Sequence, residues 1–315
     1  MKTIEELKSS WESIHPAINS YILIETEHPL EFHIGFSSDG QMCFIVNDTG
    51  MIDYLKSSKA ISVQCGKYIG DAYSLRFTLI QRKLDDLFIK LCWNLIDASQ
   101  GESIDAVQRL TQEYINWQRL LQALGSQGLS SAQQKGLMAE LLYLSEMIAK
   151  VGPDEALASW VGPEASDQDF VFTNSWAEVK ATSISSDKVS ISSLQQLDRN
   201  DDGKLIVFRM DKTTARGANC ITLMEVIDHI NSQFQNQHQR DIFECKLIKC
   251  GLLSGDYYRH SDRFNITKEM EYYVSSDFPR LTPSTAPASI VEAKYSISLS
   301  SATPFMREES QWQWK

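Results

Sequence analysis

The chain has 315 residues, and 43% of them are hydrophobic and 23% charged, a composition typical of a folded protein and not of a disordered one. With 30 basic and 41 acidic residues, the formal net charge is −11. This balance excludes a protein whose whole surface binds nucleic acid or anionic lipid, although a local basic groove stays possible. No apolar run reaches the roughly 18 residues of a membrane span, and MKTIEELKSS lacks a secretory apolar core. We therefore expect a cytoplasmic protein with no membrane contact.

Residues 1–100 are predicted to form an N-terminal, β-rich α+β accessory module. Thr3-Ile4-Glu5-Glu6 is a capping box that opens a first helix. Asp39-Gly40 is predicted to form a hairpin turn between two of the strand-like runs in this segment. These runs are Tyr21–Glu25, Phe32–Phe36, Met42–Val46, Ile61–Gln64 and Tyr73–Ile80. The pattern indicates a small folded module without visible chemistry.

Long helices are predicted next, because apolar residues recur at helical spacing. One stripe runs from Leu84 to Leu95 and a second from Ile104 to Leu124, ending at Gly125 and Gly128. A third helix is predicted from Ser131 to Lys150, stopped by Gly152-Pro153. Residues 101–315 are therefore expected to hold a helical connector, a second domain and a C-terminal extension.

After the third helix the hydrophobic period changes toward that of strands. Asp169–Phe172 and Trp176–Thr182 are predicted to form a hairpin, and a buried strand is predicted at Leu205–Met210. Between them lies a predicted short helix at 194–198. Further predictions are a helix after the capping box at Thr222, another ending at Gly251, and strands at 271–274 and 290–299. The whole reads as an α/β (α+β) fold with a mixed sheet flanked by helices.

A zinc site is not expected from this sequence. The six cysteines contain no CxxC pair, and the six histidines contain no HExxH. In a reducing compartment such thiols are more simply core residues.

Three acids and a lysine form the most informative constellation. Glu140 lies within or beside the apolar stripe of the third helix, where a carboxylate is costly unless it is paired or bound to metal; its structural alternative is a side chain that reaches out to water. Glu178 and Lys180 point to one face of their strand because side chains alternate. A short hairpin brings Asp169, at the start of the neighbouring strand, beside them. Taken singly, each has a purely structural explanation, such as a surface ion pair or a turn cap.

This arrangement suits a hard divalent cation, which prefers oxygen ligands. A metal held by Asp169 and Glu178 would activate water and neutralise charge on a scissile phosphate. Lys180 would orient the attacking water or stabilise developing negative charge.

The pattern [DE]-x-K alone is not specific, since the chain contains it five times. Two copies lie on predicted helices and one lies in a turn, so their side chains do not share a strand face. Glu292/Lys294 is a rival, because it lies on a predicted strand with Asp277 upstream, but no helix follows it. Only Glu178/Lys180 has an acid at a strand start and an acid-bearing helix before it, and a predicted helix after it.

The order Glu140, Asp169, Glu178-Val179-Lys180 and Gln195/Gln196 resembles the PD-(D/E)XK nuclease superfamily, whose restriction-endonuclease-like core carries metal-binding acids and a lysine. More narrowly, several short sequence stretches are similar to those of the bacterial "putative PD-(D/E)XK motif protein" family. The stretches concerned are Gly136–Leu141, Asp169-Phe170, Glu178–Thr182, Leu194–Leu197, and 274–280, with the helix that contains Trp117. One departure is Gln168, which stands where the superfamily often has proline.

The resemblance implies Asp169 and Glu178 as metal ligands and Lys180 as the catalytic lysine. It also implies Glu140 as an auxiliary acid at the metal and Gln196, or Gln195, as a residue that positions substrate or water. Asp167 is an alternative ligand to Asp169. The implied cofactor is Mg²⁺, with Mn²⁺ as a substitute.

The resemblance further implies a DNA endonuclease in restriction-modification or phage-defence (antiviral) gene clusters, with helicase or ATPase and methyltransferase partner subunits. The alternative is a catalytically inactive subunit that keeps the fold for DNA binding or assembly. Basic residues after the site are either phosphate contacts or a solvated face: Arg199, Lys204, Arg209, Lys212, Arg216, Arg240 and Arg280. The oligomeric state is not indicated.

Overall fold

A computed structural model describes residues 2–14, 20–123, 129–164, 166–252 and 262–313. The chain divides into two compact units, Met1–Ser126 and Gln127–Lys315. The boundary follows the second long helix, which therefore belongs to the first unit, whereas we expected it to lie with the second. Gly125 and Gly128, the predicted end of that helix, lie outside the described residues.

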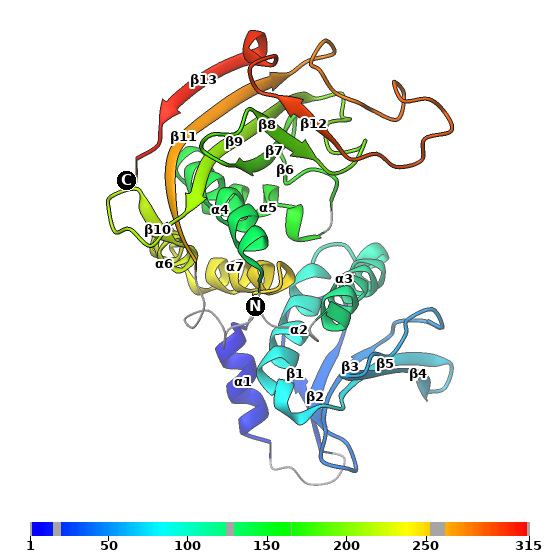
Figure 1. Cartoon of the computed structure of the whole chain (residues 1–315). Helices are drawn as coiled ribbons and strands as arrows, with labels where there is room; N and C mark the ends of the chain where they lie inside the picture. The colour runs from blue at the N-terminus through cyan, green and yellow to red at the C-terminus, as the bar shows by residue number, and fades with distance from the viewer. Residues whose placement is uncertain (1, 15–19, 124–128, 165, 253–261, 314–315) are drawn as a thin grey trace. The chain divides into compact units, whose positions relative to one another are not determined.

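The first unit contains a five-stranded antiparallel sheet with strand order β1-β2-β3-β5-β4 (Figure 1). Its strands are β1 (Tyr21–Ile24), β2 (Phe32–Phe36), β3 (Met42–Asn47), β4 (Ile61–Ile69) and β5 (Ala72–Leu79). All five predicted strands are confirmed, and so is the hairpin turn between β2 and β3, where Gly40 has a φ of 69°.

Helices α1 (Ile4–Glu12), α2 (Asp85–Ala98) and α3 (Ser103–Ala123) complete the first unit, with a 3-10 turn, η1 (Arg82–Leu84). The capping box at Thr3 is present in full. Phe77 of β5 lies 4.9 Å from Tyr114 of α3 between ring centroids, and the Trp117 indole of α3 donates to the Asn94 side chain of α2 at 2.7 Å. Buried apolar area of this kind holds the sheet against α2 and α3.

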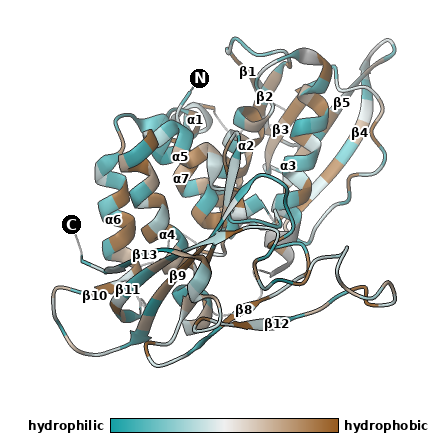
Figure 2. Cartoon of the chain, turned by 90° about the horizontal axis from the view of Figure 1, so that it is seen from above, coloured by the Kyte–Doolittle hydropathy of each residue, from teal (hydrophilic) through white to brown (hydrophobic). Residues whose placement is uncertain are grey.

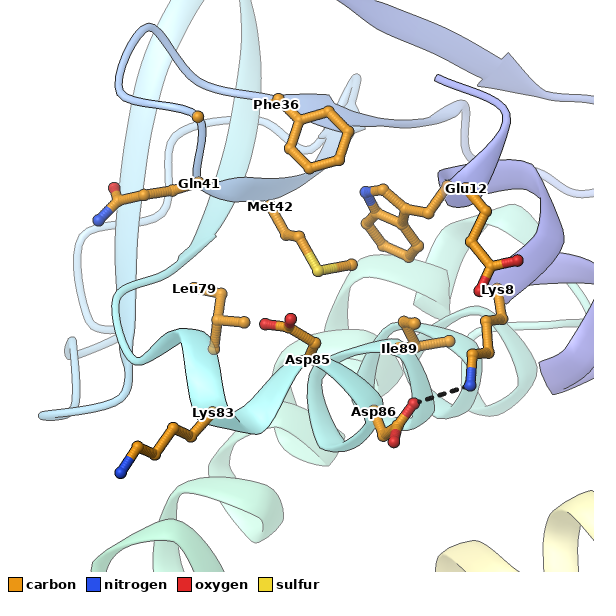
Figure 3. Close-up of a pocket in the computed structure, with 12 residues that line it drawn as sticks. Lys8, Glu12, Phe36, Gln41, Met42, Leu79, Lys83, Asp85, Asp86 and Ile89 are labelled. Carbon is orange, nitrogen blue, oxygen red and sulfur yellow. Dashed lines mark ion pairs between the residues drawn. The ribbon is translucent and has the colours of Figure 1, made fainter. Parts of the chain in front are cut away.

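A pocket of about 520 Å³ opens in the first unit (Figure 3). Phe36, Met42 and Ile89 form part of its apolar lining, and Lys8 and Asp86 form an ion pair of 3.1 Å at its edge. The Asp86 side chain is 73% exposed and that of Lys8 is 38% exposed, so water screens the ion pair and it contributes little to stability.

The second unit contains a six-stranded sheet in the order β10-β11-β9-β7-β6, with β13 also paired to β11. Strands β7 and β9 are parallel and the other pairs antiparallel, so the sheet is mixed. Its strands are β6 (Phe170–Val171), β7 (Ser175–Thr182), β9 (Asp202–Lys212), β10 (Cys220–Thr222), β11 (Arg263–Val274) and β13 (Met306–Gln311).

Four helices pack against one face of this sheet, and a two-stranded ribbon packs against the other (Figure 1). The helices are α4 (Ser131–Val151), α5 (Pro153–Ser159), α6 (Leu223–Gln233) and α7 (Gln237–Lys249), and the 3-10 turn η2 (Gly162–Glu164) follows α5. The ribbon is β8 (Lys188–Ile191) with β12 (Tyr295–Ser298), and η3 (Thr303–Phe305) precedes β13. Figure 2 shows hydrophobic and hydrophilic residues together on α6, as expected of a helix with one buried face.

Most predicted elements of the second unit are confirmed. The capping boxes at Ser130 and Thr222 are complete, and Gly251, with a φ of 89°, ends α7. Gly152-Pro153 ends α4, and Pro153 begins α5, where its fixed φ suits the first helical position. No helix among the described ranges is both long and apolar enough to cross a membrane.

The predicted helix at 194–198 is wrong, because the structure has a turn there. Leu194 and Leu197 are both buried, and their spacing fits one turn as well as a helix. The predicted strand at 290–299 is shorter, since 290–294 are irregular and only β12 is a strand. Strands β8, β10 and β13 and helix α5 were not predicted; β13 (MREESQ) has no buried residue and so lacks the apolar alternation that would mark it as a strand.

Candidate functional site

The β6–β7 hairpin brings Asp169 and Glu178 together. Phe170 on β6 is paired with Ala177 on β7, so the residue before Phe170 lies opposite the residue after Ala177. Directly opposite side chains project to the same face of a sheet with Cβ atoms about 5 Å apart. The backbone N–H of Val179 also donates to Asp169 Oδ2 at 2.8 Å, which fixes this carboxyl against β7.

Glu178 and Lys180 form an ion pair through Glu178 Oε1 and Lys180 Nζ. The side chain of Glu178 is 0% exposed and that of Lys180 is 18% exposed. Glu178 Oε2 is buried and has no hydrogen-bond partner among the described residues. A buried carboxylate oxygen without a partner is costly, and such an atom suggests a missing ligand.

Glu140, on α4, approaches the same place from the helical layer. Its Oε2 accepts a hydrogen bond from the indole Nε1 of Trp160 at 2.9 Å. A Cβ added to Gly162 would lie 3.2 Å from both Glu140 Oε2 and Asp169 Oδ1. The two carboxyl groups therefore flank a common space, which stays open because residue 162 has no side chain.

Burial raises the pKa values of all three acids, and the charge of Asp169 raises those of Glu140 and Glu178 further. Burial, followed by the charge of Asp169, raises the pKa of Glu140 to about 8. The pKa of Asp169 is raised by burial, although Lys180 and the Val179 N–H act in the opposite direction. The pKa of Glu178 is raised well above its ordinary value by burial and then by Asp169. A cation in this space would offset the repulsion among these groups.

The pKa of Lys180 is raised as well, which keeps its side chain charged. Burial lowers the pKa of Lys180, but the charges of Glu178 and Asp169 outweigh burial, so its pKa is raised. Lys180 is therefore an ammonium at neutral pH. It points into the acidic group and supplies a fixed positive charge there.

A divalent cation fits this donor set. The available oxygens belong to carboxyl groups, and one of them, Glu178 Oε2, is buried without a hydrogen-bond partner among the described residues. Gly162 leaves the space between Glu140 and Asp169 open. Within the described ranges, no three His, Cys, Asp or Glu side chains are arranged so that they could hold a metal ion together. Mg²⁺ needs only one or two carboxylates, with waters and substrate phosphates as its remaining ligands. The residues that would hold it are Asp169 and Glu178, with Glu140 beside them.

The other predicted site residues occupy turns or irregular chain. Asp167 is exposed in the turn before Asp169, which favours Asp169 over this alternative. Gln196 lies in a turn, not on a helix, and its side-chain carbonyl accepts from the Ser192 N–H at 2.7 Å. Glu292 and Lys294 are exposed on irregular chain, so the rival motif lacks the strand that would place both side chains on one face.

Gln168 and Trp160 belong to the site but were not singled out as functional from the sequence. The buried amide of Gln168 donates to the Gln195 carbonyl at 2.8 Å and thereby ties the turn of Asp169 to that of Gln196. Trp160 precedes the Gly162-Pro163 dipeptide, a turn signal that was not used in predicting the site and that would not by itself reveal the contact of Trp160 with Glu140.

Most of the candidate phosphate contacts are occupied by the chain itself. Lys204 pairs with Glu271 at 2.9 Å and Lys212 with Asp262 at 2.6 Å. The remaining contacts are those of Arg199 with Asp201, Arg209 with the carbonyls of Ile184 and Ser186, Arg240 with the Phe234 carbonyl, and Arg280 with the Leu197 carbonyl. Arg216 is exposed.

A mixed sheet with helices on one face, a hairpin carrying Asp and Glu-x-Lys, and an acid on the flanking helix define a restriction-endonuclease-like, or nuclease-like, fold. The chain belongs to the family described as "Putative PD-(D/E)XK family member, (DUF4420)", whose model matches residues 7–300. The match includes the five-stranded sheet of the first unit as well as the site. No curated protein and no solved structure matches the chain.

Proposed function

We propose that this protein is a Mg²⁺-dependent DNA endonuclease that hydrolyses phosphodiester bonds. The observation that carries the proposal is the buried Glu178 Oε2, which has no hydrogen-bond partner within the described residues and belongs to a carboxyl group paired with Lys180 and opposite Asp169. Burial of two carboxyl groups and an ammonium has an unfavourable desolvation free energy unless the group binds a ligand. Membership of the PD-(D/E)XK family supports the same reaction.

Asp169 and Glu178 would hold the cation, and Glu140 would assist directly or through water. When bound, the metal would supply Lewis-acid stabilisation of the phosphate and a more acidic water. Lys180 holds a positive charge beside Glu178 and would orient the attacking water or stabilise the charge that develops on the phosphate. Trp160 holds the Glu140 carboxyl by its indole N–H, and Gln168 holds the turn of Gln196 close to that of Asp169.

We further propose that the protein acts in the cytoplasm as a subunit of a restriction or phage-defence system. Partner subunits with helicase or ATPase activity, or a methyltransferase, would bring the DNA. The internal pairing of Lys204, Lys212 and Arg209 supports a need for such partners, because these cations are not free to bind phosphate without breaking contacts. The first unit, residues 1–126, would serve recognition of a partner or target.

The same pairing favours a second candidate, a catalytically inactive subunit that binds DNA or assembles a complex. Plasmid cleavage separates the two. Purified wild-type protein, alone and with the products of neighbouring genes, is incubated with supercoiled plasmid and Mg²⁺ or Mn²⁺, and a chelator control removes the metal. The endonuclease hypothesis predicts nicked or linear product that depends on the metal, whereas the inactive subunit yields none under any of these conditions.

Two isosteric variants test the site itself. Lys180→Met and Asp169→Asn are each expected to reduce cleavage by about 10²–10⁴-fold. The matched control is Lys294→Met in the exposed rival motif, which is expected to cleave as wild type does. Cleavage that survives both site variants would refute the residue assignment.

A further inference from the structure

The five residues from Trp160 to Glu164, which we call the 160–164 turn, contact both Glu140 and Asp169. Trp160 donates through its indole to Glu140 Oε2 at 2.9 Å. The backbone N–H groups of Val161 and Gly162 both donate to the Asp169 carbonyl, at 2.9 and 3.0 Å. The turn therefore fixes the Glu140 side chain and the Asp169 backbone at the same time.

A single buried lysine from a distant helix holds this turn at both ends. Lys246, on α7, is 6% exposed, and its Nζ donates to the Trp160 carbonyl at 2.6 Å and pairs with Glu164 Oε1 at 2.7 Å. Burial of an ammonium is unfavourable unless it is paired and hydrogen-bonded. An apolar residue would fill the same volume at lower cost, so the contacts that the ammonium makes to the turn are its distinguishing feature.

We propose that Lys246 is a positioning residue that acts through the 160–164 turn to place Glu140 and Asp169. The inference rests on the proposed function, because the two acids are placed there to bind the metal. Lys246 acts through its contacts with the turn and not as a metal ligand itself. It fixes the carbonyl of Trp160, whose indole in turn fixes Glu140, and it fixes Glu164 on the far side of Gly162. Outer-shell partners of this kind typically change metal affinity by 10–100-fold.

The test compares Lys246→Met, which removes the charge and keeps most of the volume, with Lys246→Arg, which keeps the charge. Trp160→Phe removes the indole N–H, and Lys150→Met is the matched control, since Lys150 lies on α4 and its side chain is 62% exposed. The first readout is the affinity for Mn²⁺, measured by calorimetry on folded protein far below Tm. The second is the indole ¹H–¹⁵N resonance of Trp160 in protein labelled with ¹⁵N-tryptophan and free of metal.

Lys246→Met is expected to weaken Mn²⁺ binding by about 10–100-fold and to shift the Trp160 resonance in the same direction as Glu140→Gln does. Lys246→Arg is expected to restore most of the affinity, and Lys150→Met to change neither readout. The double variant Trp160→Phe/Lys246→Met should lose less than the two single losses combined, because both act through one turn.

A merely structural role would lower Tm and leave both the indole resonance and the Mn²⁺ affinity of the folded protein unchanged, and that result would overturn the inference. If wild-type protein binds no Mn²⁺, the proposed function fails. The indole resonance then decides the positioning role without reference to metal.

Discussion

Glu178 and Lys180, two residues apart on β7, form an ion pair in which the carboxylate is fully buried and the ammonium is 18% exposed. The strand places both side chains on one face, and the sheet removes Glu178 from water. An ion pair of this kind contributes little net stability relative to apolar residues, because desolvation offsets the attraction. Stability therefore does not explain why this ion pair is buried in the sheet, whereas a role in the proposed metal site does.

The first prediction concerns the isosteric variant Glu178→Gln. It removes the carboxylate that the proposed mechanism needs, so cleavage should fall by about 10²-fold or more. The free energy of unfolding should fall, by up to about 3–5 kcal/mol, because the largely buried ammonium of Lys180 loses the carboxylate paired with it. Plasmid cleavage and urea unfolding measure the two effects. A variant that cleaves normally would contradict the role of Glu178.

The second prediction separates Asp169 from Asp167. Asp169→Asn removes a carboxylate that lies opposite Glu178 and accepts from the Val179 N–H, so cleavage and Mn²⁺ binding should both be lost. Asp167→Asn changes an exposed carboxylate two residues away and should leave both within about two-fold of wild type, as surface substitutions usually do. The reverse order of effects would transfer the ligand role to Asp167.

The third prediction uses two glycines of the second unit. In Gly162→Ala the new Cβ would lie 3.2 Å from oxygens of both Glu140 and Asp169, so the space between the acids narrows and Mn²⁺ affinity should fall about ten-fold. Gly136→Ala is the control, because nothing lies within 4 Å of its added Cβ and it sits inside α4. Alanine there should raise the free energy of unfolding by up to about 1 kcal/mol without changing metal affinity. Equal Mn²⁺ affinity in both variants would show that Gly162 is not part of the site.

The fourth prediction concerns pH. Glu269, on β11, lines a cavity of about 710 Å³ with Glu146 and Lys150 of α4. Burial, followed by the hydrogen bond and charge of Glu146, raises the pKa of Glu269 to about 9, while Lys150 acts in the opposite direction. The folded state therefore binds more protons than the unfolded state between pH 4.5 and about 9, and the free energy of unfolding falls as pH rises through this window.

Glu269→Gln should remove this contribution, so its Tm should equal that of wild type near pH 4 and exceed it by about 3 °C at pH 9. Glu292→Gln, in exposed irregular chain, is the control and should follow the wild-type curve. Thermal unfolding followed by circular dichroism from pH 4 to pH 9 gives both curves. If the Glu269→Gln and wild-type curves run parallel, the carboxyl of Glu269 is not perturbed as described.

The strand Trp176–Thr182 shows what local pattern can predict. Alternation alone put Glu178 and Lys180 on one face, and the predicted hairpin of Asp169–Phe172 with Trp176–Thr182 brings Asp169 to them. Capping boxes at Thr3 and Thr222 fixed two helix starts, because the bonds they make lie within four residues. The segment 194–198 shows the limit of such patterns. Its carbonyls at Gln195 and Gln196 are bonded by Gln168 from another turn, and a contact across 27 residues has no local signature.

The sequence by itself determined most of the element types, the sharing of a face by Glu178 and Lys180, and the relationship to the PD-(D/E)XK family. Only the tertiary structure decided that Glu140 meets Asp169 across Gly162, that Trp160 holds Glu140, and that Lys246 holds the turn between them. The physical reason is the range of the interactions. Side-chain alternation and helix capping act over a few residues, whereas convergence of α4, α7 and the β6–β7 hairpin depends on how buried apolar faces pack.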